Sequence, residues 1–388
     1  MSGCRILPSL TTPCYLYKLI AGMRLLPCLF AVWLPMTVLA ESLPPVRTVF
    51  VILMENQNWS DIAGNPSAPY INDTLLPMAS HCEQYYNPPY IHPSLPNYLW
   101  LEAGTNFGVL DDSHPDTNHQ NTTNHLAALL RSAGISWKTY QEDISGTYVP
   151  LANTNNYAVR HNPFVYFDDI TGTNNPEFAY GIAHIRPYEE LAGDLMNNTV
   201  ARYNFITPNT CDDMHDCGIQ QGDSWLAAEV PKILASPAYK NGGALFITWD
   251  EATGGDGPIG MIVLSPLARG GGYSNNINYT HSSTLRTIQE IFGLTPLLGD
   301  AANATDLSDL FSQYSQYRIS SSIRLDNGTV RLTATGVIPG RTNLVQASSD
   351  LVNWTPVSTN ISATNTFTVT DAATTNSAAR FYRLVQLP

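Results

Sequence analysis

The sequence predicts an α/β domain, with a central sheet covered by helices on both faces, followed by a small antiparallel β-sandwich. Between residues 47 and 294, continuous apolar runs alternate with amphipathic stretches, and this alternation is typical of a sheet packed between helices. After residue 310 the chain is rich in Thr, Ser, Asn and Val, with short alternating runs that indicate antiparallel strands. A length of 388 residues also favours two folded units.

The strands of the α/β domain are predicted at four apolar runs, because strands buried on both faces are apolar throughout. These runs are residues 49–54, 203–206, 244–249 and 261–264. Helices are predicted between and after them, at residues 124–132, 224–234 and 282–292. Gly293 follows the last of these helices and is a typical stop signal.

The C-terminal part, residues 317–388, is predicted to be a separate domain joined by a linker at residues 312–316. The runs 329–333 and 366–369, with turn signals at 326–328 and 339–340, predict its strands. Its predicted core residues are Trp354, Phe381 and Tyr382. This part contains no histidine, no cysteine and no cluster of acids, so we assign it no chemistry and expect at most contact with a surface or polymer.

The net charge of −13 is unevenly distributed: residues 1–40 and 317–388 each carry +3, which leaves −19 for the middle of the chain. So acidic a domain argues against a nucleic-acid partner held by phosphate contacts. It agrees with carboxylates collected to bind hard cations, although solubility alone explains most acidic surfaces.

Residues 1–40 are predicted to be a signal peptide. Basic residues precede an apolar stretch at 25–39, and small residues before Glu41 suit cleavage. The stretch is short and interrupted by prolines, so we expect no stable membrane span; an uncleaved anchor is the alternative, and Met23 is an alternative start. The protein is therefore expected to be secreted, to the periplasm or the extracellular space, with its α/β domain at residues 41–311.

Three of the six cysteines lie in the predicted signal peptide, which leaves Cys82, Cys211 and Cys217 in the mature chain. In an exported protein, Cys211 and Cys217 are close enough in sequence to form a small disulfide loop. Cys82 is then expected to be buried and inert. The alternative is a zinc site of Cys211, His215 and Cys217, which lacks an obvious fourth ligand nearby.

Three predicted strands end in acidic residues. The first runs into Glu55 and Asn56, the run 203–206 leads to a loop with Asp213 and His215, and the run 244–249 leads to Asp250 and Glu251. Functional residues in open α/β sheets gather beyond the carboxyl ends of the strands. Carboxylates, histidines and amide oxygens gathered there are suitable ligands for divalent metals.

Metals of this kind neutralise the charge of a phosphate ester and activate a hydroxyl nucleophile beside them. The candidate hydroxyl is that of Ser94, because Pro93 and Pro96 restrict the chain around it and a short helix is predicted at residues 95–103. Ser94 would then lie at a helix N-terminus, which favours an anionic phosphoryl group. The alternative is that Ser94 is simply an N-cap.

Nine short motifs occur in a fixed order along residues 47–295. They are residues 54–56, 93–98, 136–142, 160–164, 207–209, 213–216, 222–226, 248–251 and 280–283. On these motifs the chain resembles the bacterial and fungal phosphoesterase family of secreted acid phosphatases and phosphatidylcholine-type phospholipases C. That family lies within the alkaline phosphatase superfamily, so the resemblance implies an alkaline phosphatase-like central sheet.

The resemblance also implies residue roles. Ser94 would be the nucleophile that forms a phosphoseryl intermediate, and His161 would be a phosphate ligand or leaving-group acid. The implied ligands of a metal beside the serine are Glu55, Asn56, Asp250 and Glu251. The implied ligands of a second metal, or of the phosphate in a one-metal site, are Asp213, His215 and His281.

Two departures from the superfamily pattern bear on the metal. Superfamily relatives with two zinc ions usually have a histidine after the late aspartate, whereas Glu251 follows Asp250 here. Their other motif separates aspartate and histidine by four positions, whereas Asp213 and His215 are two apart. Both differences favour Ca²⁺, Mg²⁺ or Mn²⁺ over a pair of Zn²⁺ ions, and the number of metals stays open.

The sequence therefore predicts a secreted, metal-dependent phosphoesterase, most simply an acid phosphatase that hydrolyses phosphate monoesters through phosphoserine. The first alternative is a phospholipase C that cleaves lipid phosphodiesters, although no broad apolar or basic lipid-docking segment is evident. The second alternative is a non-catalytic surface-binding protein in which the C-terminal domain is the functional part.

Overall fold

A computed structural model describes residues 43–311, 318–337, 340–372 and 380–386. The first range contains an eight-stranded sheet and a separate pair of short strands. The sheet consists of β1 (Thr48–Met54), β2 (Ser80–Cys82), β4 (Trp137–Gln141), β5 (Ile185–Pro187), β6 (Tyr203–Thr207), β7 (Gly243–Trp249), β8 (Met261–Leu264) and β9 (Tyr273–Asn275). The pair is β3 (Tyr85–Tyr86) and β10 (Tyr279–Thr280).

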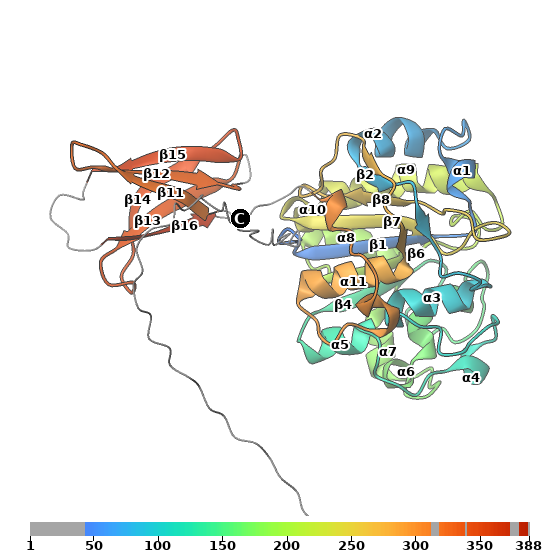
Figure 1. Ribbon diagram of the computed structural model, residues 1–388. Coiled ribbons are helices and arrows are strands. Elements are labelled where there is room, and N and C mark those ends of the chain that lie inside the picture. Colours follow the sequence, from blue (N-terminus) through green and yellow to red (C-terminus); the bar gives the residue numbers. More distant parts are fainter. Residues whose placement is uncertain (1–42, 312–317, 338–339, 373–379, 387–388) are drawn as a thin grey trace, which may run out of the picture. The chain divides into compact units, whose positions relative to one another are not determined.

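The sheet has the order β5-β4-β6-β1-β7-β8-β2-β9 (Figure 1). The first five strands in this order, β5, β4, β6, β1 and β7, run parallel to one another. Strand β8 pairs antiparallel with both of its neighbours, β7 and β2. All four strands predicted from apolar runs are present, and β6, β7 and β8 are buried along their whole length. The predicted α/β class is therefore confirmed, and β6, β1 and β7 lie side by side at the centre.

Helices cover both faces of this sheet. They are α1 (Trp59–Ile62), α2 (Leu76–Met78), α3 (Ser94–Ala103), α4 (Pro115–Asn118), α5 (Leu126–Ser132), α6 (Asp168–Thr171), α7 (Ala179–His184), α8 (Glu189–Asn197), α9 (Ile219–Ala235), α10 (Pro237–Lys240) and α11 (His281–Phe292). The chain also forms a π-helical turn, η1 (Ile71–Leu75), and 3₁₀ turns at η2 (Val159–His161), η3 (Pro163–Tyr166), η4 (Gly299–Ala302) and η5 (Ser308–Leu310). Figure 1 shows α9 on one side of the central strands and α3 with α11 on the other.

The predicted helices are present, with shifted starts. Helix α5 begins two residues later than predicted, because the His125 side chain caps it by accepting the Ala128 N–H at 3.3 Å. Helix α9 begins at Ile219, before the predicted start at 224. The added first turn includes Gly222, where a Cβ would lie 2.3 Å from the Met214 side chain, so the glycine allows close packing there. Gly293 ends α11 in the left-handed conformation with φ 66°, as predicted.

The C-terminal residues form two three-stranded antiparallel sheets. One contains β11 (Arg318–Arg324), β12 (Val330–Thr335) and β15 (Thr366–Asp371), and the other contains β13 (Thr342–Ser348), β14 (Thr355–Ile361) and β16 (Phe381–Gln386). Buried Leu332, Val345 and Val369 join the two sheets in one small core, so the predicted β-sandwich is confirmed.

Two of the three core residues predicted for this sandwich are wrong. Phe381 is 41% exposed. Trp354 is half-buried but lies outside the core, beneath the guanidinium of Arg383, which is 4.4 Å from its ring centroid. Tyr382 packs against the core and donates its hydroxyl to Asp371 at 3.1 Å. Smaller aliphatic residues fill the interior because two short three-stranded sheets enclose little volume.

Cys211 and Cys217 form a disulfide and Cys82 is buried as a free thiol, as predicted. Among the described residues, no helix has the length and apolar character needed to cross a membrane. The predicted signal peptide, residues 1–40, and the predicted linker, residues 312–316, lie outside the described residues. The domain boundaries at 41–311 and 317–388 stay predictions.

Candidate active site

The predicted acidic residues meet at the carboxyl edge of β6, β1 and β7. Because these neighbouring strands are parallel, their ends lie at one edge of the sheet. Backbone bonds tie the exits together: the Glu55 N–H donates to the Asp213 carbonyl at 2.8 Å, and the Asp250 N–H donates to the Met54 carbonyl at 3.0 Å. Residues far apart in the chain are thus held in one cluster by the sheet itself.

Ser94 lies within this cluster. It is the first residue of α3, and its side chain makes no capping bond to its own helix, so the N-cap alternative is wrong. The buried Ser94 Oγ instead donates to Glu55 Oε2 at 3.1 Å. One turn along the helix, Tyr98 donates its hydroxyl to Glu55 Oε1 at 2.5 Å. Both oxygens of Glu55 are therefore bound by residues of one helix face.

Asn56 brings a third oxygen-bearing side chain to the cluster. It has a left-handed backbone with φ 34°, and its N–H donates to Asp250 Oδ1 at 3.0 Å. Its side-chain amide lies between two carboxylates: with the nitrogen turned toward them, it donates to Glu55 Oε2 at 2.5 Å and to Asp250 Oδ1 at 3.1 Å. The amide oxygen is the atom of Asn56 that would bind a cation.

A second group lies on the other side of Glu55. His161 has ring nitrogens 3.3 Å from Glu55 Oε1 and 3.2 Å from Asp213 Oδ2, and these three buried residues can present ligand atoms within 4.8 Å of one another. Burial lowers the pKa of His161 well below its usual range, so the neutral ring carries a single N–H for two carboxylates. His161 Nε2 and Asp213 Oδ2 accordingly have no hydrogen-bond partner.

The acids of the cluster all have raised pKa values. Burial, followed by the charges of Asp250 and Asp213, raises the pKa of Glu55 well above its usual range. Burial raises the pKa of Asp213 to about 8. Burial, assisted by the neighbouring charge of Glu251, raises the pKa of Asp250 to about 7. Buried carboxylates that repel one another are stabilised either by protonation or by a bound metal cation. A bound cation lowers the pKa values of these acids again.

The donor set fits a divalent cation. Asp250 Oδ2 is buried without a hydrogen-bond partner, as are Asp213 Oδ2 and His161 Nε2. Oxygen ligands with one imidazole suit Mg²⁺, Mn²⁺ or Ca²⁺ and are also compatible with Zn²⁺. The residues present could therefore hold the predicted metal.

Two of the predicted ligands, Glu251 and His281, have other contacts. Glu251 Oε2 accepts from His92 Nδ1 at 2.7 Å and from Asn97 Nδ2 at 2.9 Å. His281 Nε2 lies 2.6 Å from the backbone carbonyl of Asp250, and its Nδ1 lies 3.2 Å from the Tyr85 hydroxyl. The structure thus places Glu251 beside the cluster and turns both nitrogens of His281 away from it.

His215 is exposed at the rim of the cluster. Its Nδ1 pairs with Asp216 at 2.7 Å and its Nε2 faces Arg160 at 3.3 Å. Of the predicted site residues, the structure brings together Ser94, Glu55, Asn56, Asp250, Asp213 and His161.

Sequence reasoning missed His92, Asn97 and Tyr98 as parts of the site. All three lie within four positions of Ser94. Asn97 and Tyr98 follow the serine by three and four residues, which is the spacing of neighbours on one helix face. That spacing was the available signal.

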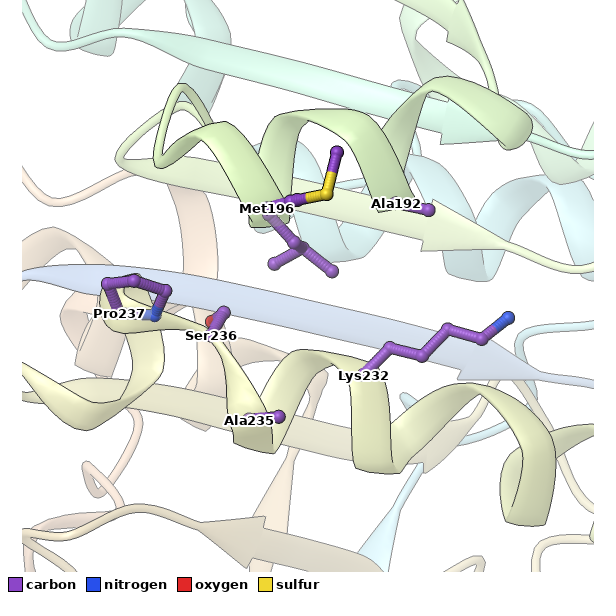
Figure 2. Close-up of a pocket in the computed structure, with 7 residues that line it drawn as sticks. Ala192, Met196, Lys232, Ala235, Ser236 and Pro237 are labelled. Carbon is purple, nitrogen blue, oxygen red and sulfur yellow. The ribbon is translucent and has the colours of Figure 1, made fainter.

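A separate pocket of about 260 Å³ lies between α8 and α9 (Figure 2). Its lining includes Ala192 and Met196 of α8 and Lys232 and Ala235 of α9. None of the clustered acids lines it, so this apolar hollow is not the reactive site.

An α/β sheet whose strand ends gather buried carboxylates around a serine is an arrangement suited to metal-assisted hydrolysis. Residues 78–295 match the Phosphoesterase family. The chain is 31% identical to a phosphatidylinositol-3-phosphatase of Mycobacterium tuberculosis over 70% of its own length and 85% of that protein. The chain therefore belongs to the phosphoesterase family and is a hydrolase of phosphate esters, as predicted.

Two further similar proteins and one solved structure match parts of the chain. An acid phosphatase of Aspergillus niger is 30% identical over 54% of the chain and 50% of that protein. A phospholipase C A of Mycobacterium tuberculosis is 24% identical over 42% of the chain and 38% of that protein. A solved structure from Vibrio parahaemolyticus, described as a protein in the alkaline phosphatase superfamily, aligns with a TM-score of 0.47 and 11% identity over 82% of this chain and 84% of that one.

Proposed function

We propose that the protein is a metal-dependent acid phosphatase that hydrolyses phosphate monoesters through a phosphoserine at Ser94. The observation that carries the proposal is the 3.1 Å contact from Ser94 Oγ to Glu55 Oε2, inside a cluster of buried carboxylates in which Asp250 Oδ2 and Asp213 Oδ2 have no hydrogen-bond partner. An alanine at position 94 would fill the same space, so packing alone does not explain a hydroxyl group beside buried carboxylates. Beside a metal it becomes a nucleophile.

Glu55, Asn56 and Asp250 would hold the metal next to Ser94, with Asp213 and His161 on the far side of Glu55. When bound, a divalent cation neutralises phosphoryl charge and lowers the pKa of a coordinated hydroxyl. We place His161 with the metal ligands and not as the leaving-group acid, because its nitrogens lie 3.3 and 3.2 Å from Glu55 and Asp213.

The chain's own residues orient the reaction. Glu55 accepts the hydrogen bond of Ser94 and thereby aims Oγ, and Tyr98 holds Glu55 in place. In the first step the Ser94 Oγ–P bond forms as the P–O bond to the leaving group breaks, and the alcohol leaves with a proton. In the second step water attacks phosphorus, the Oγ–P bond breaks, and Ser94 regains its proton as inorganic phosphate departs.

The monoesterase is preferred to a phospholipase C because the matched proteins with phosphatase names are more similar to the chain. The phosphatidylinositol-3-phosphatase reaches 31% identity over 273 residues, compared with 24% over 204 residues for phospholipase C A. Turnover of p-nitrophenyl phosphate, compared with release of phosphocholine from phosphatidylcholine micelles, separates the two. Faster release of phosphocholine would favour the lipase.

The test of the mechanism compares Ser94→Ala with wild type before and after chelation with EDTA. We expect the variant to lose activity by roughly a thousandfold or more, as for other lost nucleophiles, and chelated wild type to recover on addition of Mg²⁺, Mn²⁺, Ca²⁺ or Zn²⁺. The matched control is Ser224→Ala, because Ser224 is exposed on α9 and bonds to the Gln220 carbonyl. Normal activity of Ser94→Ala would overturn the assignment of the nucleophile.

We also propose that the protein is exported and that residues 1–40 are removed. The disulfide between Cys211 and Cys217 supports this, because disulfides persist in oxidising compartments. N-terminal sequencing of the protein recovered outside the cytoplasm is expected to begin at Glu41. The family match ends at residue 295, and we assign the C-terminal sandwich no role in the reaction.

A further inference from the structure

Arg160 lies beside His161 in η2 but reaches a different environment. The His161 ring is buried between Glu55 and Asp213, whereas the Arg160 side chain is 21% exposed. Its Nε lies 3.6 Å from Asp112 Oδ2, and its Nη2 lies 3.3 Å from His215 Nε2. One residue of the turn therefore enters the acidic cluster, and the preceding residue places a fixed positive charge at its rim.

Asp112 lies between Arg160 and the start of the helix that carries Ser94. The backbone N–H of Leu95, the residue after Ser94, donates to Asp112 Oδ1 at 3.0 Å. The two oxygens of Asp112 thus face the N-terminus of α3 and the guanidinium of Arg160. Arg160 is in this way held on the same side of the cluster as the first turn of the helix that carries Ser94.

The guanidinium is not saturated by these contacts. At 3.6 Å the Asp112 contact is too long for a hydrogen bond, and His215 offers one nitrogen rather than a bidentate carboxylate. Guanidinium groups bind phosphate oxygens through two parallel N–H donors. A dianionic monoester approaching several carboxylates needs such a cation at the entrance.

We propose that Arg160 binds the non-bridging oxygens of the phosphoryl group that is transferred to Ser94, and that Asp112 positions Arg160 for this contact. The inference depends on the proposed phosphatase function and adds to it a binding residue and a positioning residue. Because a monoester carries one more negative charge than a diester, Arg160 would also favour monoesters.

The test measures binding of inorganic phosphate by titration calorimetry, together with kcat and KM for p-nitrophenyl phosphate. We expect Arg160→Gln to weaken phosphate binding and to raise KM by at least tenfold. We expect Arg160→Lys to have an intermediate effect, because it keeps the positive charge but loses the two parallel N–H donors of the guanidinium. The control is Arg286→Gln, which removes a partly exposed arginine paired with Glu290 on α11. Turnover of bis(p-nitrophenyl) phosphate is expected to fall less than that of the monoester.

Asp112→Asn tests the positioning role. We expect it to weaken phosphate binding about threefold in the wild-type background and to have no further effect in Arg160→Gln, because Asp112 acts through Arg160. Tighter phosphate binding in Asp112→Asn, or an equal effect in both backgrounds, would overturn that role.

The outcomes separate this inference from the proposed function. An active enzyme in which Arg160→Gln and Arg160→Lys both bind phosphate as tightly as wild type contradicts the inference and leaves the function intact. A wild-type protein that hydrolyses no aryl phosphate with any of the four metals contradicts the function, and the calorimetric comparison still decides the phosphate contact.

Discussion

The Tyr98 hydroxyl donates to Glu55 Oε1 at 2.5 Å, one helical turn after Ser94 donates to the other oxygen of the same carboxylate. The Tyr98 ring also stacks on His161, with centroids 5.3 Å apart and planes 3° apart. One tyrosine thus orients two residues of the candidate metal site.

We therefore expect Tyr98→Phe to lower kcat by roughly tenfold, because a hydrogen bond to a charged group contributes about 1.5–3 kcal/mol. The phenylalanine ring preserves the stacking, so the effect reports the hydroxyl. Measurement of kcat and of the metal concentration for half-maximal activity checks this. Tyr166→Phe is the control, because that buried hydroxyl donates to the Ser113 backbone, at 3.2 Å. Equal kcat values for the two variants would contradict the role of Tyr98.

His281 is expected to position Asp250 rather than to bind the metal. Its Nε2–H donates to the Asp250 carbonyl at 2.6 Å and its Nδ1 accepts from Tyr85 at 3.2 Å. We expect His281→Ala to lower the melting temperature and to weaken metal binding about tenfold, as for outer residues of metal sites. Asp250→Ala should weaken it at least a hundredfold. Metal titration by calorimetry distinguishes the two, and an equal loss would make His281 a ligand.

The disulfide closes a loop that holds Asp213 and His215. For a loop of this length the chain-entropy model gives about 2 kcal/mol of stabilisation. We expect the double variant Cys211→Ser/Cys217→Ser to unfold at lower temperature and to bind the metal more weakly, because the Asp213 loop loses its restraint. Thermal denaturation and metal titration measure both effects. Cys82→Ser is the control outside the loop; unchanged metal binding in the double variant would show that β6 and α9 hold Asp213 without the disulfide.

Glu102 predicts a pH dependence of stability that is separate from the reaction. This carboxyl is buried on α3, one oxygen accepts from Tyr203 at 2.6 Å, the other has no partner, and burial raises its pKa to about 8. Because the folded-state pKa is raised above the unfolded value, its contribution to stability is complete below about pH 4.5 and is lost as the pH rises through about 8.

Glu102→Gln should therefore match wild type near pH 5 and exceed it near pH 9 by up to roughly 4 kcal/mol, since each pKa unit corresponds to about 1.4 kcal/mol. Urea unfolding at the two pH values measures the difference. Glu177→Gln, at an exposed position, should show no such crossover. A variant that is less stable than wild type at pH 9 would mean that folding does not raise the pKa of Glu102.

The position of the reactive edge could be predicted from the sequence, because apolar runs identify β1, β6 and β7 and acidic residues follow each of them. Which side chains converge could not. His281 and His215 belong to the family motifs, but the first points to a carbonyl and the second to Arg160. Sequence order specifies which residue reaches an edge and not the direction of its side chain, which depends on the neighbours that pack around it.

Sequence patterns alone predicted the α/β class, the C-terminal sandwich, the disulfide and the serine that lies in the acidic cluster, because periodicity, cysteine spacing and short motifs are local properties. Three contacts appear only in the folded protein: His161 lies between Glu55 and Asp213, Glu251 accepts hydrogen bonds from His92 and Asn97, and Asp112 lies between the start of α3 and Arg160. Each of these pairs joins residues from different elements, so its geometry follows from the packing of the whole sheet.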